Sequence, residues 1–235
     1  MNDLIVAWTP FNYFLFPFKK WNGRSTHPVL SKVWIRDRYE IWKRFTYQSI
    51  AAQSGEFIYF VACHILSKYI TDSVFYDVTR KDKRVRLLYF GTREYNEIMR
   101  DIRNGYNNTF AIRIDSDDMY SDGTFQYIRE QFPEDQQYGY FKEGYGYEPR
   151  STGLWKYDCC GSGPFYVVKY PPKMYRFDPV EHTYIKSAGA AILEPGHFIV
   201  NVHENNHSTN VRPPHFCEEV KYAEKEKVLS RFIHK

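Results

Sequence analysis

Hydrophobic positions in the first half of the chain form short continuous runs, and these runs alternate with segments whose apolar residues recur at helical spacing. The continuous runs lie at residues 4–8, 57–62, 85–90 and 109–114. Runs of this length that are apolar at nearly every position are typical of strands buried on both faces of a parallel sheet. The pattern therefore predicts four strands of one sheet.

Helical spacing fills the segments between these runs. Apolar residues recur along one face from Trp34 to Gln53, and Ser54-Gly55 ends that pattern. Shorter helices are predicted near residues 67–76 and 93–103. Such alternation predicts an α/β fold, with a Rossmann-like, mostly parallel sheet flanked by helices. Ligands bind at the carboxyl ends of the strands in sheets of this kind.

The second half of the chain is less regular. Residues 144–163 are rich in Gly and Tyr, and we interpret them as a long loop. Strands are predicted at residues 165–168 and 197–202, and a charged terminal helix at 217–232. Because no internal repeat or linker divides the chain, we predict a single domain over residues 1–235.

Charge is distributed unevenly between the two halves. The net charge of +4 is too small to indicate a nucleic-acid partner by itself. Residues 1–110 carry 17 Lys and Arg against 10 Asp and Glu, whereas the remaining residues carry 15 against 18. A basic first half is suited to a phosphate-bearing ligand and an acidic second half to a cation, although solvated helix faces explain the distribution equally well.

The cysteines and the hydrophobic segments bear on location. None of Cys63, Cys159, Cys160 and Cys217 has the spacing of a zinc cluster, and adjacent cysteines rarely bridge. Prolines interrupt the apolar segment at 4–18, which also lacks a cleavage site, and no run is long enough to span a bilayer. We therefore expect a reduced, cytoplasmic protein without a membrane span.

The most distinctive feature is the acidic segment Asp115-Ser116-Asp117-Asp118, which follows the fourth predicted strand. Three carboxylates in four residues repel one another unless a cation or a basic partner neutralises them. A turn could bring Asp115 and Asp117 onto one Mn²⁺ or Mg²⁺ ion, and that ion could bridge two phosphates. The alternative is an ordinary acidic turn in which Asp117 or Asp118 caps a helix. The position of the acidic segment at the end of a buried strand favours the metal site over the ordinary turn.

Several motifs, taken in order, resemble a known family. They are Thr9-Pro10-Phe11-Asn12; Trp34-x-x-x-Arg38-x-x-x-Trp42 with Ser49-Ile50-x-x-Gln53-x-x-x-Phe57; Arg113-Ile114-Asp115-Ser116-Asp117-Asp118; and Val202-His203-Glu204-Asn205-Asn206-His207-Ser208. Together they are similar to GT-A glycosyltransferases, and most closely to the rhamnosyltransferase family of bacteria and phages. Pro10 and Cys63 depart from that family, which often has arginine and an acidic residue there, so the nucleotide base stays open.

The resemblance implies a GT-A fold and transfer of a sugar from a nucleoside-diphosphate sugar to a hydroxyl acceptor. Residues 1–120 would bind the donor and residues 121–235 would form the acceptor side. It also implies a Mn²⁺ or Mg²⁺ ion on Asp115, Asp117 and His203. The residues expected to contact the donor are Thr9, Asn12, Arg38, Arg113, Asp115 and Ser116.

A catalytic base and an acceptor are less clearly indicated. An inverting transferase needs a carboxylate to take the acceptor proton, and the candidates are Asp158, Asp178 and Glu181. Each is more readily interpreted as an ordinary surface acid, and a retaining enzyme need not use a base. The acceptor could be a glycan, a lipid-linked sugar, a protein or a modified nucleic-acid base.

Three other classes of function stay open. One is a non-catalytic nucleotide- or carbohydrate-binding protein on the same fold, and another is a metal-dependent phosphoesterase. The third follows from His203-Glu204-Asn205-Asn206-His207, which matches the HExxH signature of zinc metalloproteases. That signature requires a helix, whereas residues 197–202 are strand-like and the motif is rich in asparagine. The sequence therefore favours the transferase over the metalloprotease.

Overall fold

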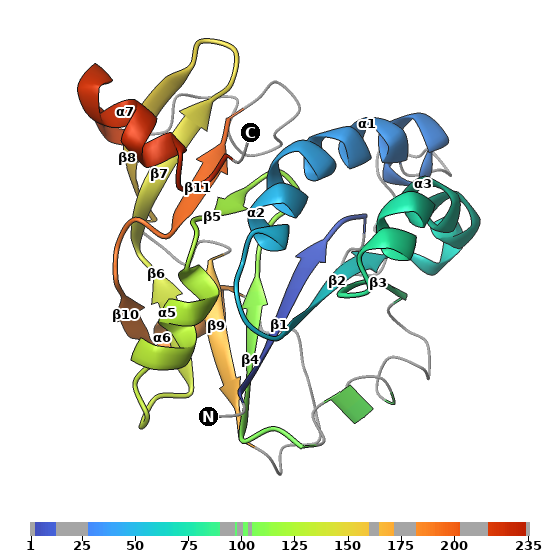
Figure 1. The fold of residues 1–235 in the computed structure, drawn as a ribbon, viewed down its shortest axis with the longest axis horizontal. Coiled ribbons are helices and arrows are strands. Elements are labelled where there is room, and N and C mark those ends of the chain that lie inside the picture. The colour runs from blue at the N-terminus through green and yellow to red at the C-terminus, as the bar shows by residue number, and fades with distance from the viewer. Residues whose placement is uncertain are drawn as a thin grey trace.

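The computed structural model describes residues 3–12, 28–89, 97, 101–102, 105–159, 165–171, 182–202 and 216–233. Within these ranges the chain forms two sheets (Figure 1). The main sheet has the strand order β10-β6-β9-β4-β1-β2-β3. Its strands are β1 (Asp3–Pro10), β2 (Phe57–Cys63), β3 (Val85–Tyr89), β4 (Asn108–Arg113), β6 (Tyr138–Phe141), β9 (Tyr166–Tyr170) and β10 (Ala191–Leu193).

The main sheet is mostly parallel, which confirms the predicted fold class. Strand β1 pairs in parallel with β2 on one side and with β4 on the other, and β2 pairs in parallel with β3. Strand β9 runs antiparallel between β4 and β6. Residues 3–9 are all buried because β1 is central and covered on both faces, which explains its uninterrupted apolar run.

Helices cover both faces of this sheet. On one face lie α1 (Lys32–Trp42), the π-helical turn η2 (Lys43–Tyr47), α2 (Gln48–Ala51), α3 (Lys68–Lys81) and α5 (Thr124–Gln131). On the other face lies α6 (His182–Ser187). Two short 3₁₀ turns, η1 (Pro28–Leu30) and η3 (Ile65–Ser67), precede α1 and α3. None of the helices described is long and apolar enough to cross a membrane.

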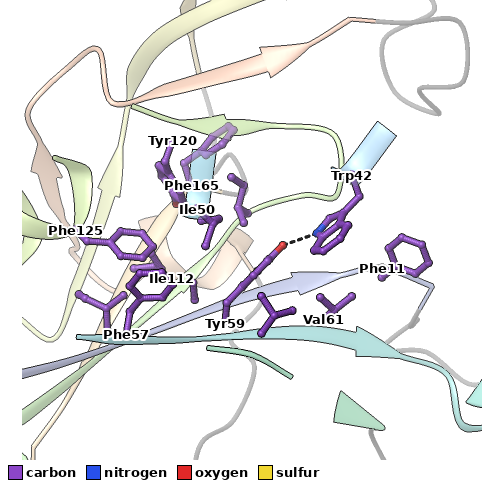
Figure 2. Packing of buried hydrophobic residues seen from close by; sticks show 14 of the residues in the cluster. Phe11, Trp42, Ile50, Phe57, Tyr59, Val61, Ile112, Tyr120, Phe125 and Phe165 are labelled. Carbon is purple, nitrogen blue, oxygen red and sulfur yellow. Dashed lines mark hydrogen bonds between the residues drawn. The ribbon is translucent and has the colours of Figure 1, made fainter. Parts of the chain in front are cut away.

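The core between β2 and α1 is aromatic. Trp42 is fully buried and packs on Tyr59 and Phe75, with ring centroids 6.1 and 4.8 Å away. The indole Nε1–H of Trp42 donates to the hydroxyl of Tyr59 at 2.7 Å (Figure 2). That hydroxyl also lies 2.6 Å from Thr9 Oγ1. Buried aromatic side chains with polar tips need such partners, so these bonds fix the packing of α1 over β1 and β2.

The second sheet has the order β12-β8-β7-β11-β5. Its strands are β5 (Met119–Tyr120), β7 (Glu143–Glu148), β8 (Gly153–Asp158), β11 (Phe198–Asn201) and β12 (Phe216–Glu219), and α7 (Tyr222–Leu229) follows them. In Figure 1 the strands β7, β8 and β11 lie with α7 on the side of the molecule away from α3.

Two sequence predictions about this half are wrong. The predicted loop at 144–163 contains the antiparallel pair β7–β8. Gly144 of β7 is a glycine because the neighbouring strand passes so close that a Cβ at this position would lie 2.6 Å from the carbonyl oxygen of Phe198. The predicted helix at 217–232 begins only at Tyr222, since residues 216–219 pair with β8. Both strands depend on partners distant in the sequence, so local patterns do not reveal them.

A buried histidine makes stability depend on pH. His197 is 8% exposed, its Nδ1 lies 3.2 Å from Thr124 Oγ1, and burial, with Arg231 nearby, lowers its pKa to about 4. Because the unfolded chain binds this proton with a pKa of about 6.5, acid favours unfolding. Stability should be full above about pH 6.5 and fall as the pH drops toward about 4.

We expect this group alone to lower the free energy of unfolding by about 2 kcal/mol between pH 7.5 and pH 5.0. Urea unfolding at the two pH values measures the difference. The variant His197→Gln should lose that part of the pH dependence, whatever its own stability. An unchanged pH dependence in His197→Gln would show that His197 is not the responsible group.

Candidate functional site

The site predicted from the sequence lies where the strand order of the main sheet reverses. The chain leaves β1 toward β2 and β3 on one side, and β4 then lies on the other side of β1. At such a switch point the loops leave the carboxyl ends of two neighbouring strands in opposite directions and open a crevice for ligands. Trp8 near the end of β1 is level with Arg113, and Ile114 N–H donates to the Trp8 carbonyl at 3.1 Å.

Residues 115–118, which we call the acidic turn, follow β4 at this point. The N–H of Asp118 donates to the carbonyl of Asp115 at 3.2 Å, and the chain then enters β5. Helix α5 begins beyond β5 and has Gly123 at its N-cap. Neither Asp117 nor Asp118 caps that helix, so the helix-capping interpretation of this acidic segment is wrong.

Two arginines neutralise the acidic turn. Arg38 of α1 donates to Ser116 Oγ at 2.7 Å and forms an ion pair with Asp117 at 2.9 Å. Arg113 donates through Nε and a terminal nitrogen to Asp115 Oδ1, at 3.2 and 3.0 Å. Both guanidinium side chains are only 16% exposed, which strengthens these pairs relative to surface ones. Five predicted site residues thus meet in one place.

The third carboxylate of the turn is buried. Asp118 is 4% exposed and accepts the backbone N–H of Asn201 at 3.1 Å. Burial, followed by the neighbouring charges of Asp117 and Asp115, raises the pKa of Asp118 well above its usual value. The side-chain amide of Asn201 also donates to the Asp117 carbonyl. Asp118 and Asn201 therefore belong to the framework of the turn.

Polar residues of η2 and α2, together with Gln53 just after α2, hold the backbone at the start of this turn and beyond it. Thr46 Oγ1 donates to the Asp115 carbonyl at 3.3 Å, and Ser49 Oγ accepts the N–H of Tyr120 at 3.2 Å. Gln53 donates to the Ser121 carbonyl at 2.8 Å and accepts the N–H of Phe125 at 3.1 Å. Ser49 and Gln53 were visible in the sequence only as part of a motif. Ser49 lies in α2, and Gln53 follows that helix and donates to the Ser49 carbonyl at 2.9 Å.

Thr9 and Asn12 point into the protein. Thr9 is fully buried beside Tyr59, and Asn12 is 2% exposed. The amide of Asn12 donates to the Val29 carbonyl and to Ser67 Oγ, and its oxygen accepts the N–H of His64 at 3.0 Å. Both residues thus brace the end of β1, and their contact with a donor stays a prediction.

The remaining predicted residues are placed as follows. Asp158 ends β8, where its Oδ2 lies 3.4 Å from Lys142 Nζ, and its buried Oδ1 has no hydrogen-bond partner within the described part of the chain. His203, Asp178 and Glu181 lie outside the described residues, as does the whole HExxH segment. Among the residues that are described, no group of three His, Cys, Asp or Glu side chains could hold a metal ion.

Neither a protein-family model nor a curated protein matches this sequence. Among solved structures, the chain is similar to S. aureus TarS 1-349 in complex with UDP-GlcNAc, with 14% identity over 99% of this chain and 71% of TarS and a TM-score of 0.46. It is also similar to 4-diphosphocytidyl-2C-methyl-D-erythritol synthase, with 11% identity over 95% of both chains and a TM-score of 0.34. These values are too low to assign an activity, and the fold class follows from the strand order of the chain itself.

Proposed function

We propose that this chain is a metal-dependent glycosyltransferase that moves a sugar from a nucleoside-diphosphate sugar to a hydroxyl acceptor. One observation carries the proposal: the acidic turn, with Arg38 and Arg113, lies at the switch point between β1 and β4. That crevice is where parallel sheets bind nucleotides, and the turn combines carboxylates with guanidinium groups. Among the motifs that resemble GT-A glycosyltransferases, residues 113–118 include the acidic turn, Arg38 contacts it, and Thr9 lies near the end of β1.

Asp115 and Asp117 are the proposed carboxylate ligands of a hard divalent cation. Asp115 and Asp117 leave the same turn, and their side chains are 36% and 10% exposed. Carboxylate oxygens are the preferred ligands of Mg²⁺ and Mn²⁺, and such sites often use only one or two carboxylates together with substrate phosphates. His203 is the proposed third protein ligand. When bound, the ion would stabilise the charge that develops on the departing diphosphate.

The protein residues would bind and orient the donor. Arg38 and Arg113 are planar donors suited to phosphate oxygens, and their pairs with Asp117 and Asp115 hold them at the turn. Ser116 lies beside Arg38 and would contact the donor with it. Thr9 and Asn12 are proposed to complete this side of the site, as the resemblance implies.

The second half of the chain would form the acceptor side. Asp158, Asp178 and Glu181 remain the proposed bases for an inverting reaction. Of these, Asp158 is the one whose surroundings are described: it ends β8, and its Oδ2 lies 3.4 Å from Lys142 Nζ. The proposed activity is that of a hexosyltransferase.

A ligand screen tests the proposal. Thermal unfolding of the protein is followed with UDP, GDP, CDP, ADP and TDP, each with and without Mn²⁺, and turnover is then measured with sugars of the responding nucleotide. We expect one diphosphate to raise the melting temperature only with Mn²⁺, because ligands of the folded state stabilise it. Binding without turnover of any sugar would favour a non-catalytic binding protein. No response to any nucleotide, together with tightly bound zinc, would favour the metalloprotease.

A further inference from the structure

Asn201 ends β11 in the second sheet, and it contacts the acidic turn, which Arg38 of α1 also contacts. It is fully buried and makes two bonds to neighbouring residues of the turn. Its backbone N–H donates to Asp118 Oδ1 at 3.1 Å, and its side-chain amide donates to the main-chain carbonyl of Asp117. Sequence reasoning gave this asparagine no role.

Strand β11 pairs with a neighbouring strand on each side, which restrains the position of Asn201 at its end. It pairs antiparallel with β5, which continues directly from the turn, and parallel with β7. The N–H of Val202 donates to the Tyr147 carbonyl at 2.8 Å, which extends the pairing with β7 beyond Asn201. The N–H of Ser121 likewise donates to the His197 carbonyl at 2.9 Å.

The bond to the Asp117 carbonyl has a specific geometric effect. A carbonyl held in place fixes the peptide plane between Asp117 and Asp118, and this plane sets the directions in which both side chains leave the backbone. An aspartate at 201 would place an acceptor against that carbonyl, and an alanine would remove the donor. The bond to Asp118 comes from the backbone and needs only a residue at this register, whereas the bond to the Asp117 carbonyl needs a side chain that donates.

We propose that Asn201 is a positioning residue of the nucleotide and metal site, which couples the second sheet to the orientation of Asp117. The inference rests on the proposed function, since the site it positions is the proposed donor site. It assigns the second sheet a part in donor binding, in addition to the acceptor side. Groups that orient metal ligands in this way typically change metal affinity by about 10- to 100-fold when removed.

The test compares Asn201→Ala with Asn108→Ala. Asn108→Ala is the control because Asn108 is a partly buried asparagine whose amide also donates, to Asp3 at 3.1 Å, and because it lies at the start of β4, at the opposite end of that strand from the turn. Two quantities are measured: amide hydrogen exchange over residues 114–121, and the affinity for Mn²⁺ with the nucleoside diphosphate that stabilises the wild type. Asn201→Ser, which is too short to reach the carbonyl, serves if the alanine variant does not fold.

We expect Asn201→Ala to exchange faster over residues 114–121 and to bind the Mn²⁺–nucleotide about 10-fold more weakly. Asn108→Ala should change neither quantity. Equal behaviour of the two variants would overturn the inference, and so would faster exchange with unchanged affinity, because the contact would then be structural alone. If the wild type binds no nucleotide, the proposed function and this inference both fail. If the wild type binds and Asn201→Ala binds equally well, only this inference fails.

Discussion

Replacing Asp117 by asparagine should reduce sugar transfer by at least about 10²-fold while the protein stays folded. The change removes a charge that the proposed site uses twice, once toward the cation and once toward Arg38, which lies 2.9 Å away. The substitution keeps the shape of the side chain, so packing around the turn should be preserved. The rate is measured as kcat with the donor identified by the ligand screen.

The matched control is Asp82→Asn. Asp82 is a carboxylate of similar exposure, 12%, and its two oxygens accept bonds from Arg84 at 2.9 and 2.8 Å. It lies between α3 and β3, at the amino end of that strand, whereas the acidic turn follows the carboxyl end of the parallel strand β4. We expect full activity from Asp82→Asn. A similar loss of kcat in both variants would mean that the activity does not depend on the acidic turn.

Replacing Trp42 by alanine should cost about 3–5 kcal/mol in the free energy of unfolding, the largest stability effect expected here. The indole is fully buried among Tyr39, Tyr47, Tyr59 and Phe75. Its removal leaves a cavity and takes a donor from the Tyr59 hydroxyl, which still lies beside Thr9. Urea unfolding followed by circular dichroism measures the change.

Trp34→Ala is the control, since Trp34 lies on the same helix but is only partly buried, with its ring 6.0 Å from that of Phe11. Trp34→Ala should lower the free energy of unfolding by clearly less than Trp42→Ala, because removing a partly buried side chain gives up less buried apolar area. Trp42→Phe should fall between the two alanine variants, as it keeps most of the packing and loses the hydrogen bond. If Trp42→Ala lowered the free energy of unfolding by no more than Trp34→Ala, the packing of Trp42 between α1 and β2 would not be a main source of stability.

The first half of the fold could be predicted from the sequence because its signals are local. The run Leu4–Trp8 is apolar at every position, and β1 is buried on both faces. The predicted helix at 34–53 corresponds to α1, η2 and α2. The π-helical turn within it was not predicted, because the buried residues Trp42, Phe45, Ser49 and Ile50 keep the spacing of three and four residues that an ordinary α-helix also shows. That turn carries Thr46, which bonds the Asp115 carbonyl.

The strand predicted at 197–202 corresponds to β11 of the second sheet, but the strands that pair around it could not be predicted in the same way. Strands β7 and β8 contain glycines and tyrosines that are also typical of loops, and they become strands through pairing with β11 and β12. The candidate site was therefore found only in part. The acidic residues were visible because three carboxylates adjoin a strand, whereas Asn201 came from a segment whose pairing the sequence does not encode locally.

The measurement that tests the central claim most directly is a calorimetric titration of nucleoside diphosphates into the wild type, Asp117→Asn and Asp82→Asn, each with Mn²⁺ and with a chelator. The account predicts that one diphosphate binds the wild type and Asp82→Asn with Mn²⁺, and that binding is lost with the chelator and in Asp117→Asn. Equal binding by all three proteins, or binding that does not respond to the chelator, would contradict a metal and nucleotide site on the acidic turn.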